Sequence, residues 1–179
     1  MTPLYDDAVR VLTDWRPEPA RDRTLALLSA GPDAMYRAHP AGHVTASALV
    51  LDHAYERVLL CLHGRIRRWM QLGGHCEPAD TSLAAAALRE ATEESGIAGL
   101  RLVPEPIDVD IHEVTCGGRP SYHHDVRYVV VAPPGARELV SDESAALGWF
   151  RPGELPSPLA DATERLIAPA LAMAARHPA

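Results

Sequence analysis

The sequence predicts an α/β/α sandwich, with a mixed β-sheet between helices and a short helical extension before it. Three observations predict this class. The chain has 179 residues, 47% of them hydrophobic, which is enough for one domain with a substantial core. Alternating or uniformly apolar runs, typical of strands, come between stretches with helical periodicity. The first forty residues show helical periodicity alone.

The opening residues predict two helices. Thr2-Pro3 is a favourable start, with proline at the first helical position, and an apolar stripe follows at helical spacing. A second helix is expected at about residues 20–30, ending before Gly31-Pro32. We therefore divide the chain into a helical extension, residues 1–40, and a main domain, residues 41–179. The extension is expected to pack on the main domain, because its stripe must be covered; a substrate lid or a dimer contact is the alternative.

Five runs predict the strands of the sheet. They form two hairpins and one strand before the last helix: residues 43–51 with 57–62, residues 107–114 with 122–132, and residues 146–150. The last helix is expected to start at Ser157-Pro158, and Pro169 is expected to kink or end it.

The stretch between the two hairpins predicts a glycine-containing loop and then a helix. Ser82, or Thr81 before it, is the expected N-cap, and Gly96 is the expected C-cap. At 100° per residue, one arc of this helix carries three carboxylates, those of Glu90, Glu93 and Glu94. The opposite side is expected to pack on the sheet and carries Ala84, Leu88, Ala91 and Ser95. One turn below the carboxylates, room for a ligand is expected at Ala86 and Ala87.

Three carboxylates on one arc repel one another. Glu90 is followed at the i+4 position by Glu94, where a salt-bridged surface helix would place a basic residue. A divalent cation among them would make the arrangement favourable, because Mg²⁺ and Mn²⁺ prefer oxygen ligands. The alternative is an ordinary solvated acidic face.

The loop and helix together resemble the Nudix box, G-x(5)-E-x(7)-R-E-U-x-E-E-x-G-U, in which U is a bulky aliphatic residue. The matching residues are Gly74, Arg89-Glu90, Glu93-Glu94, Gly96 and Ile97. Three features depart from the pattern. Asp80 replaces the first glutamate, eight residues rather than seven separate it from Arg89, and the small Ala91 follows the R-E pair. By this resemblance, which covers about 25 residues, the chain is identified as a member of the Nudix family with a Nudix-like fold.

The resemblance implies hydrolysis of a nucleoside diphosphate linked to another group, X, with Mg²⁺ or Mn²⁺ as cofactor. It implies a metal site made by Glu90, Glu93 and Glu94 with Gly74 of the loop, and an Arg89 that holds a glutamate of the box in place. Metal ions neutralise the pyrophosphate charge and lower the pKa of the attacking water. The catalytic candidates are thus Glu93, Glu94 and Arg89. Glu143 joins them as a candidate general base, because several relatives keep a carboxylate in that loop; an ordinary acidic loop is the alternative.

Two further groups are candidate substrate contacts. Arg68 and Trp69 precede the glycine loop, where an arginine would contact phosphate and a tryptophan would stack on a base. A solvated loop and a core tryptophan are the alternatives. His123 and Arg127 share one face of the predicted strand 122–132, and contact with phosphate or ribose is predicted for them. Scattered polar residues at an exposed strand end are the alternative.

The composition limits the classes of binding partner and the cellular compartment that we expect. A net charge of −7 argues against a protein that binds nucleic-acid polymers. All 17 basic residues are arginines, so every cationic phosphate contact must come from Arg. Three separated cysteines and the absence of a signal peptide or membrane-length apolar run predict a cytoplasmic protein with no membrane partner. The expected partner is a small phosphoanhydride derived from a nucleotide, and a homodimer stays open.

Two alternatives to hydrolysis stay open at this point. A non-catalytic nucleotide-binding or regulatory Nudix domain would keep the fold without the chemistry. An isoprenyl diphosphate isomerase, a side branch of the same fold, would require a catalytic cysteine, for which Cys76 is the candidate. A zinc site is not predicted, because the cysteines and histidines, among them His75 and Cys76, do not fall in paired ligand spacings.

Overall fold

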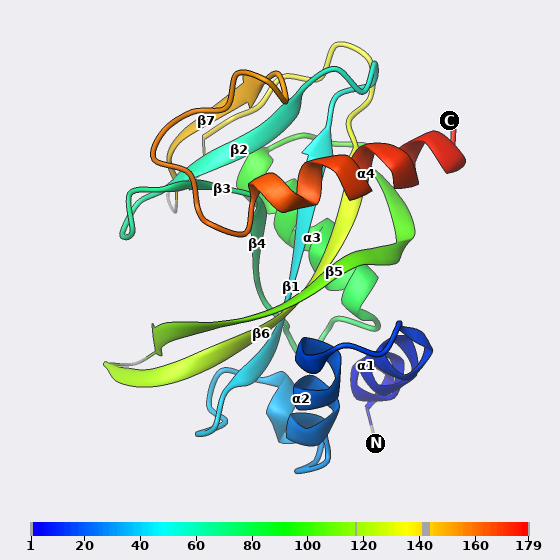
Figure 1. Ribbon diagram of the computed structural model, residues 1–179, viewed down its shortest axis with the longest axis vertical. Helices are drawn as coiled ribbons and strands as arrows, with labels where there is room; N and C mark the ends of the chain where they lie inside the picture. Colours follow the sequence, from blue (N-terminus) through cyan, green and yellow to red (C-terminus); the bar gives the residue numbers. More distant parts are fainter. Residues whose placement is uncertain (1, 117, 141–143, 179) are drawn as a thin grey trace.

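The computed structural model describes residues 2–116, 118–140 and 144–178 (Figure 1). In chain order its elements are α1 (Pro3–Asp14), α2 (Pro19–Leu28), the 3-10 turn η1 (Pro32–Met35), β1 (His43–Leu51), β2 (Val58–His63), β3 (Trp69–Met70), β4 (Leu72–His75), α3 (Leu83–Ser95), β5 (Arg101–Cys116), β6 (Arg119–Val131), β7 (Ser144–Phe150) and α4 (Glu164–Arg176).

The strands described form one mixed seven-stranded sheet in the order β3-β2-β1-β6-β5, with β4 paired to β1 and β7 paired to β2. β1 and β6 run parallel, and the other pairs are antiparallel. β1 is the branching strand: its first half pairs with β4, where Thr45 lies opposite His75, and its end pairs with β2, where Leu51 lies opposite Val58. The start of β1 therefore lies between β4 on one side and β6 on the other.

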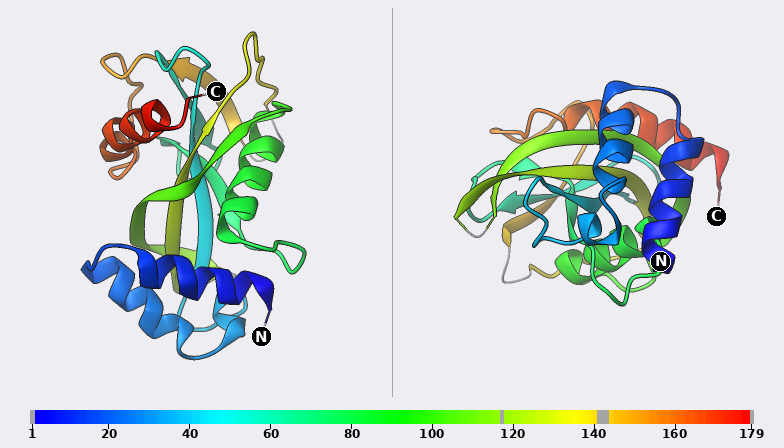
Figure 2. Two further views of the ribbon diagram at one scale, coloured as in Figure 1. Left: turned by 90° about the vertical axis from the view of Figure 1, so that its right-hand side faces the viewer. Right: turned by 90° about the horizontal axis from the view of Figure 1, so that it is seen from below.

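Helices cover both faces of the sheet, which confirms the predicted α/β/α class. Figure 2 shows α3 on one side, α4 on the other, and α1 and α2 across one end. Side chains along β1 alternate between two cores: Val44 and Ala46 belong to the core under α3, and Leu49 and Leu51 to the core under α4. This alternation determines which side chains of the sheet face α3, the helix that carries Glu90, Glu93 and Glu94.

The two N-terminal helices share the core under α3. Thr2 caps α1 by accepting a hydrogen bond from the N–H of Tyr5, and the stripe of Leu4, Ala8 and Leu12 is fully buried in that core. The predicted packing on the main domain is confirmed. The division of the chain at residue 40 stays a prediction.

The last helix differs from the prediction at both ends. It begins at Glu164, because the backbone before it pairs with β3: the N–H of Trp69 donates to the carbonyl of Pro158, and the N–H of Ala160 donates to that of Trp69. The helix continues through Pro169, whose exposed ring faces solvent, where water can serve the carbonyl left without an N–H. Within the part of the chain described, no helix combines the length and apolarity required to span a membrane.

Candidate active site

Helix α3 begins and ends where the sequence predicts. The Ser82 hydroxyl accepts a hydrogen bond from the N–H of Ala85 at 3.1 Å, and Gly96 ends the helix with a φ of 66°, which favours glycine. The carboxylate of Asp7 accepts from the N–H of Leu83, so α1 supplies a second cap. These caps fix the register in which α3 presents its charged residues to β4.

Arg89 is the centre of the charged cluster on α3. Its Nε and Nη2 donate to the two oxygens of Asp80 at 3.1 and 3.0 Å, and Nη2 also donates to the carbonyl of His75 at 2.9 Å. Its Nη1 contacts Glu90 at 3.1 Å and Glu93 at 3.0 Å. The hydrogen bonds that Arg89 donates to Asp80 are the largest of the causes that raise the pKa of Arg89. Despite the shorter side chain and the longer spacer, Asp80 thus provides a bidentate carboxylate for Arg89.

Two glycines in β4 let its backbone pass beside the glutamates. The N–H of Gly73 donates to Glu94 Oε2 at 2.9 Å. A Cβ on Gly74 would lie 2.8–2.9 Å from the Glu90 carboxylate and would force that carboxylate to move. A Cβ on Gly73, whose φ is 153°, would collide with Ser47 of β1. The glycine pair therefore makes the cradle in which the carboxylates gather.

The charge balance of the cluster differs in one respect from the prediction. Arg89 stands four residues before Glu93 and bonds to it, so the helix does carry a compensating basic residue. The inference of uncompensated repulsion is wrong to that extent. Within the described part of the chain, the single positive charge of Arg89 nevertheless contacts four carboxylates, those of Glu77, Asp80, Glu90 and Glu93.

The predicted orientation of α3 is also corrected. Ala86 and Ala87 are fully buried in the core, so they leave no space for a ligand. Ala84 and Leu88, expected against the sheet, are only partly buried. The helix is rotated so that Glu90, 13% exposed, lies near the sheet, while Glu93, 60% exposed, faces solvent.

Arg68 and Trp69 contact the loop before α4. Arg68 donates to Asp161 at 2.9 Å and to the carbonyl of Leu159 at 3.1 Å. Trp69 packs edge-on against Phe150 in the core under α4. This placement corresponds to the alternative in which the tryptophan is a core residue. The structure brings neither to the glutamates of α3, and a substrate contact for them stays a prediction.

Arg127 lies in a buried ionic network. Its guanidinium, 3% exposed, donates to Asp125 at 2.8 Å, to Asp108 at 3.0 Å and to Asp110 at 2.9 Å, and Arg165 at the start of α4 joins the last two. These partners are side chains, and the contact of Arg127 with phosphate or ribose stays a prediction. The network joins β5, β6 and α4 on the face of the sheet opposite α3.

Two other sequence candidates are Glu143 and Cys76, and Glu77 lies next to Cys76 in the loop before α3. Glu143 lies outside the described residues. Glu77 is 60% exposed and 4.0 Å from Arg89, at the margin of the cluster. Burial, with a smaller effect of Asp80, raises the pKa of Cys76 to about 12, so this thiol is protonated near neutral pH. Cys76 is a core residue, so it does not supply the catalytic cysteine that the isomerase alternative requires.

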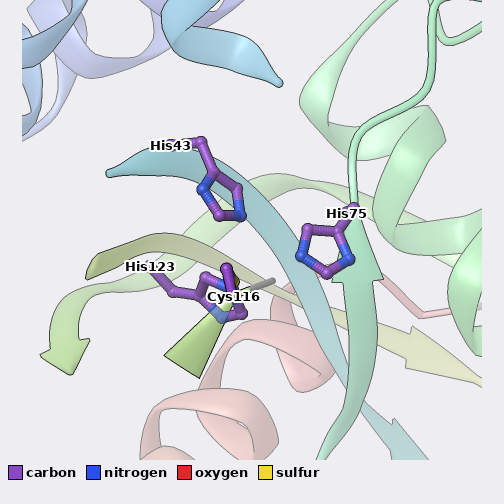
Figure 3. Close-up of side chains that lie close together, drawn as sticks. All are labelled: His43, His75, Cys116 and His123. Carbon is purple, nitrogen blue, oxygen red and sulfur yellow. The ribbon is translucent and has the colours of Figure 1, made fainter. Parts of the chain in front are cut away.

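The structure also brings together residues that were not predicted as a group. His123 lies with His43, His75 and Cys116, whose ligand atoms are all within 4.8 Å of one another. Figure 3 shows the three imidazoles and the thiol converging from separate strands. Sequence spacing held no signal for this group, because its members are 7 to 80 residues apart and meet only through strand register. The one local hint is that His43 opens an otherwise apolar strand.

Comparison with known families gives a match over most of the chain. The family model described as NUDIX domain matches residues 41–171. This range contains the glycine cradle of β4, the charged cluster of α3 and all seven strands described. No curated protein matches the sequence.

Solved structures with the same fold are hydrolases or nucleotide-binding domains. A MutT NUDIX hydrolase from Burkholderia pseudomallei is 26% identical, with a TM-score of 0.52, and the match covers 72% of this chain and 98% of that chain. An Ap4A hydrolase from C. elegans, 17% identical, has a TM-score of 0.59 over 74% and 98% of the two chains. The NUDIX domain of Shewanella oneidensis NrtR, in complex with ADP ribose, is 18% identical, with a TM-score of 0.53 over 81% and 95%.

Proposed function

This chain belongs to the Nudix family and is a Nudix hydrolase, and from that premise we propose that it cleaves a phosphoanhydride bond in a nucleoside diphosphate linked to another group, with Mg²⁺ or Mn²⁺ as cofactor. One observation carries the proposal: Glu90, Glu93 and Glu94 of α3 gather at the glycine cradle of β4.

The donor set fits a hard divalent ion. Carboxylate oxygens are the ligands that Mg²⁺ and Mn²⁺ prefer, and among the described residues the guanidinium of Arg89 contacts four carboxylates. Glu90, Glu93 and Glu94 would hold the ion. When bound, it neutralises pyrophosphate charge and lowers the pKa of the attacking water.

Each residue of the cluster has a distinct positioning task. Arg89 holds Glu90 and Glu93 through one nitrogen, while Asp80 fixes the rest of the guanidinium. Glu94 is anchored by the N–H of Gly73. Such preorganisation matters because phosphoryl transfer depends on positioning and charge stabilisation more than on covalent help from the protein. Gly74 as a metal ligand and Glu143 as general base remain predictions within this mechanism.

The test is a screen of phosphoanhydrides with Mg²⁺ or Mn²⁺, read by product mass. ADP-ribose and Ap4A are the first compounds to try, because fold neighbours bind or hydrolyse them. We expect hydrolysis of at least one compound that depends on the divalent ion. Glu94→Gln keeps an oxygen for the N–H of Gly73 but removes a charge, so turnover should fall by about two to three orders of magnitude.

The matched control is Glu105→Gln, which removes an exposed carboxylate on β5. It should keep near-normal turnover, and both variants should melt near the wild-type temperature. Near-normal turnover of Glu94→Gln would remove the proposed mechanism. Binding of nucleotide without product release, with either ion, would favour the non-catalytic alternative.

A further inference from the structure

A second group of metal-ligating side chains lies on the face of the sheet away from the glutamates. His43 is the first residue of β1, His75 the last of β4 and Cys116 the last of β5, while His123 lies on β6. The parallel register sets His43 beside His123, and the antiparallel register sets His75 opposite Thr45, two residues along β1 from His43. All four side chains therefore project to one side of the sheet, where they converge (Figure 3).

The ligand types and spacings suit a tetrahedral ion of intermediate softness. Three imidazoles and one thiol are ligands that Zn²⁺ takes in proteins. Zinc–nitrogen and zinc–sulfur bonds of about 2.0 and 2.3 Å put tetrahedral N and S ligands about 3.6 Å apart, and two N ligands about 3.3 Å apart. The Cys116 Sγ to His123 Nε2 distance is 3.6 Å. The longest separation in the group, at most 4.8 Å, would have to close by about 1.5 Å, which imidazole rotation can supply.

His43 shows the clearest sign of a missing ligand. The residue is fully buried, and neither ring nitrogen has a hydrogen-bond partner within the described chain. A buried polar group without a partner destabilises the folded state, so a native site of this kind requires an explanation.

The surroundings also favour a cation. Asp125 is two residues from His123 on the same face of β6 and belongs to the network of Arg127. In that network three aspartates face two arginines and the imidazole of His112 among the described residues, and with that imidazole neutral one net negative charge remains. A Zn²⁺ ion with three neutral imidazoles and one thiolate carries one net positive charge, so the two clusters balance.

We propose that His43, His75, Cys116 and His123 bind a transition-metal ion, with Zn²⁺ as the best match, at a site separate from the glutamate cluster of α3. The ion ties the end of the β5–β6 hairpin to β1 and β4. It also fixes His75, whose carbonyl accepts a hydrogen bond from Arg89. The proposed metal site therefore stabilises the backbone beside the glycine cradle, but the ion itself does not lie in the cradle.

The test uses the whole chain, stripped by a chelator and dialysed against Zn²⁺ or Co²⁺ with excess Mg²⁺ present for the carboxylate site. We expect one tightly held zinc per chain by elemental analysis. With Co²⁺ we expect a thiolate-to-cobalt charge-transfer band and intense tetrahedral absorption. Cys116→Ser should remove the charge-transfer band. His43→Ala should weaken zinc affinity by more than about 100-fold, because even supporting partners of a metal ligand contribute 10–100-fold.

The controls remove the same chemical groups elsewhere. Cys61→Ala deletes a buried thiol and His53→Ala an exposed imidazole, and both should keep zinc and the cobalt spectrum. Glu94→Gln should also keep zinc, which separates failure of this proposal from failure of the proposed hydrolase. If His43→Ala unfolds on heating far below the wild type, Cys116→Ser decides, since Cys116 lies outside both cores. A wild-type chain that retains neither metal, or an unchanged charge-transfer band in Cys116→Ser, overturns the proposal.

Discussion

Replacement of Arg127 by methionine separates a substrate-binding role from a structural one. Methionine fills much of the same volume but leaves Asp125, whose side chain is 5% exposed, without its cation. Burial alone raises the pKa of Asp125, but the charge and hydrogen bonds of Arg127 outweigh it and hold that pKa below its usual value. Breaking a buried ion pair costs about 3–5 kcal/mol. Asp108 and Asp110 keep Arg165, so we expect the lower end, about 3 kcal/mol.

For a chain of this size, that cost lowers Tm by about 6–12 °C. The assay is thermal unfolding followed by circular dichroism, combined with measurement of KM for a substrate found in the screen. Arg165→Met is the matched control: its guanidinium is 50% exposed, and its ion pairs should contribute at most about 1 kcal/mol. A Tm for Arg127→Met within about 2 °C of the wild type, together with a raised KM, would refute this reasoning and restore the predicted substrate contact.

Three further predictions follow from single contacts. Asp80→Asn removes the charge that fixes Arg89, so kcat/KM should fall by about 10–100-fold and the midpoint of a Mg²⁺ titration should rise. Gly74→Ala places a Cβ 2.8–2.9 Å from the carboxylate of Glu90 and should cut turnover by at least about tenfold, with Tm changed little. Burial alone raises the pKa of Asp52, but hydrogen bonds from Arg57 and the backbone outweigh it and lower the pKa. Asp52→Asn should therefore cost about 1–2 kcal/mol at pH 7. In Tm measured against pH, the difference should start to shrink as the pH falls below about 4, the pKa of the unfolded-state carboxylate, and should vanish only once the pH is below the lowered pKa of the folded state.

The parts of the site set by local geometry could be predicted from the sequence. The caps at Ser82 and Gly96 and the shared side of the glutamates depend only on helical spacing. The rotation of α3 against the sheet was misjudged, because the carboxylates were placed opposite the packed face. In the structure Glu90 and Glu94 lie at the border between sheet and solvent, and Ala86 and Ala87 complete the buried side.

The strand residues show where sequence reasoning ends. Alternation placed His123 and Arg127 on one face of β6, and the structure agrees, since both lie on the face opposite α3. Alternation does not name the partners across that face. Asp108 is 19 residues from Arg127 and joins it through the antiparallel register of β5 and β6, while Arg165 arrives from α4. A polar run on a strand therefore predicts a polar layer, and only tertiary register decides whether a substrate or other side chains occupy it.

The order of Gly74 and His75 explains how one short strand can serve two kinds of site. Successive residues of β4 point to opposite faces, so Gly74, paired with Ala46, opens the cradle toward α3, while His75, paired with Thr45, points to the other side. A slip of one residue in this register would exchange the two. The imidazole would then enter the space of the Glu90 carboxylate, and the histidine–cysteine group would lose a member. A Cβ opposite Ser47 would collide with it, so a slip in the other direction, which would place Leu72 opposite Ser47, is excluded.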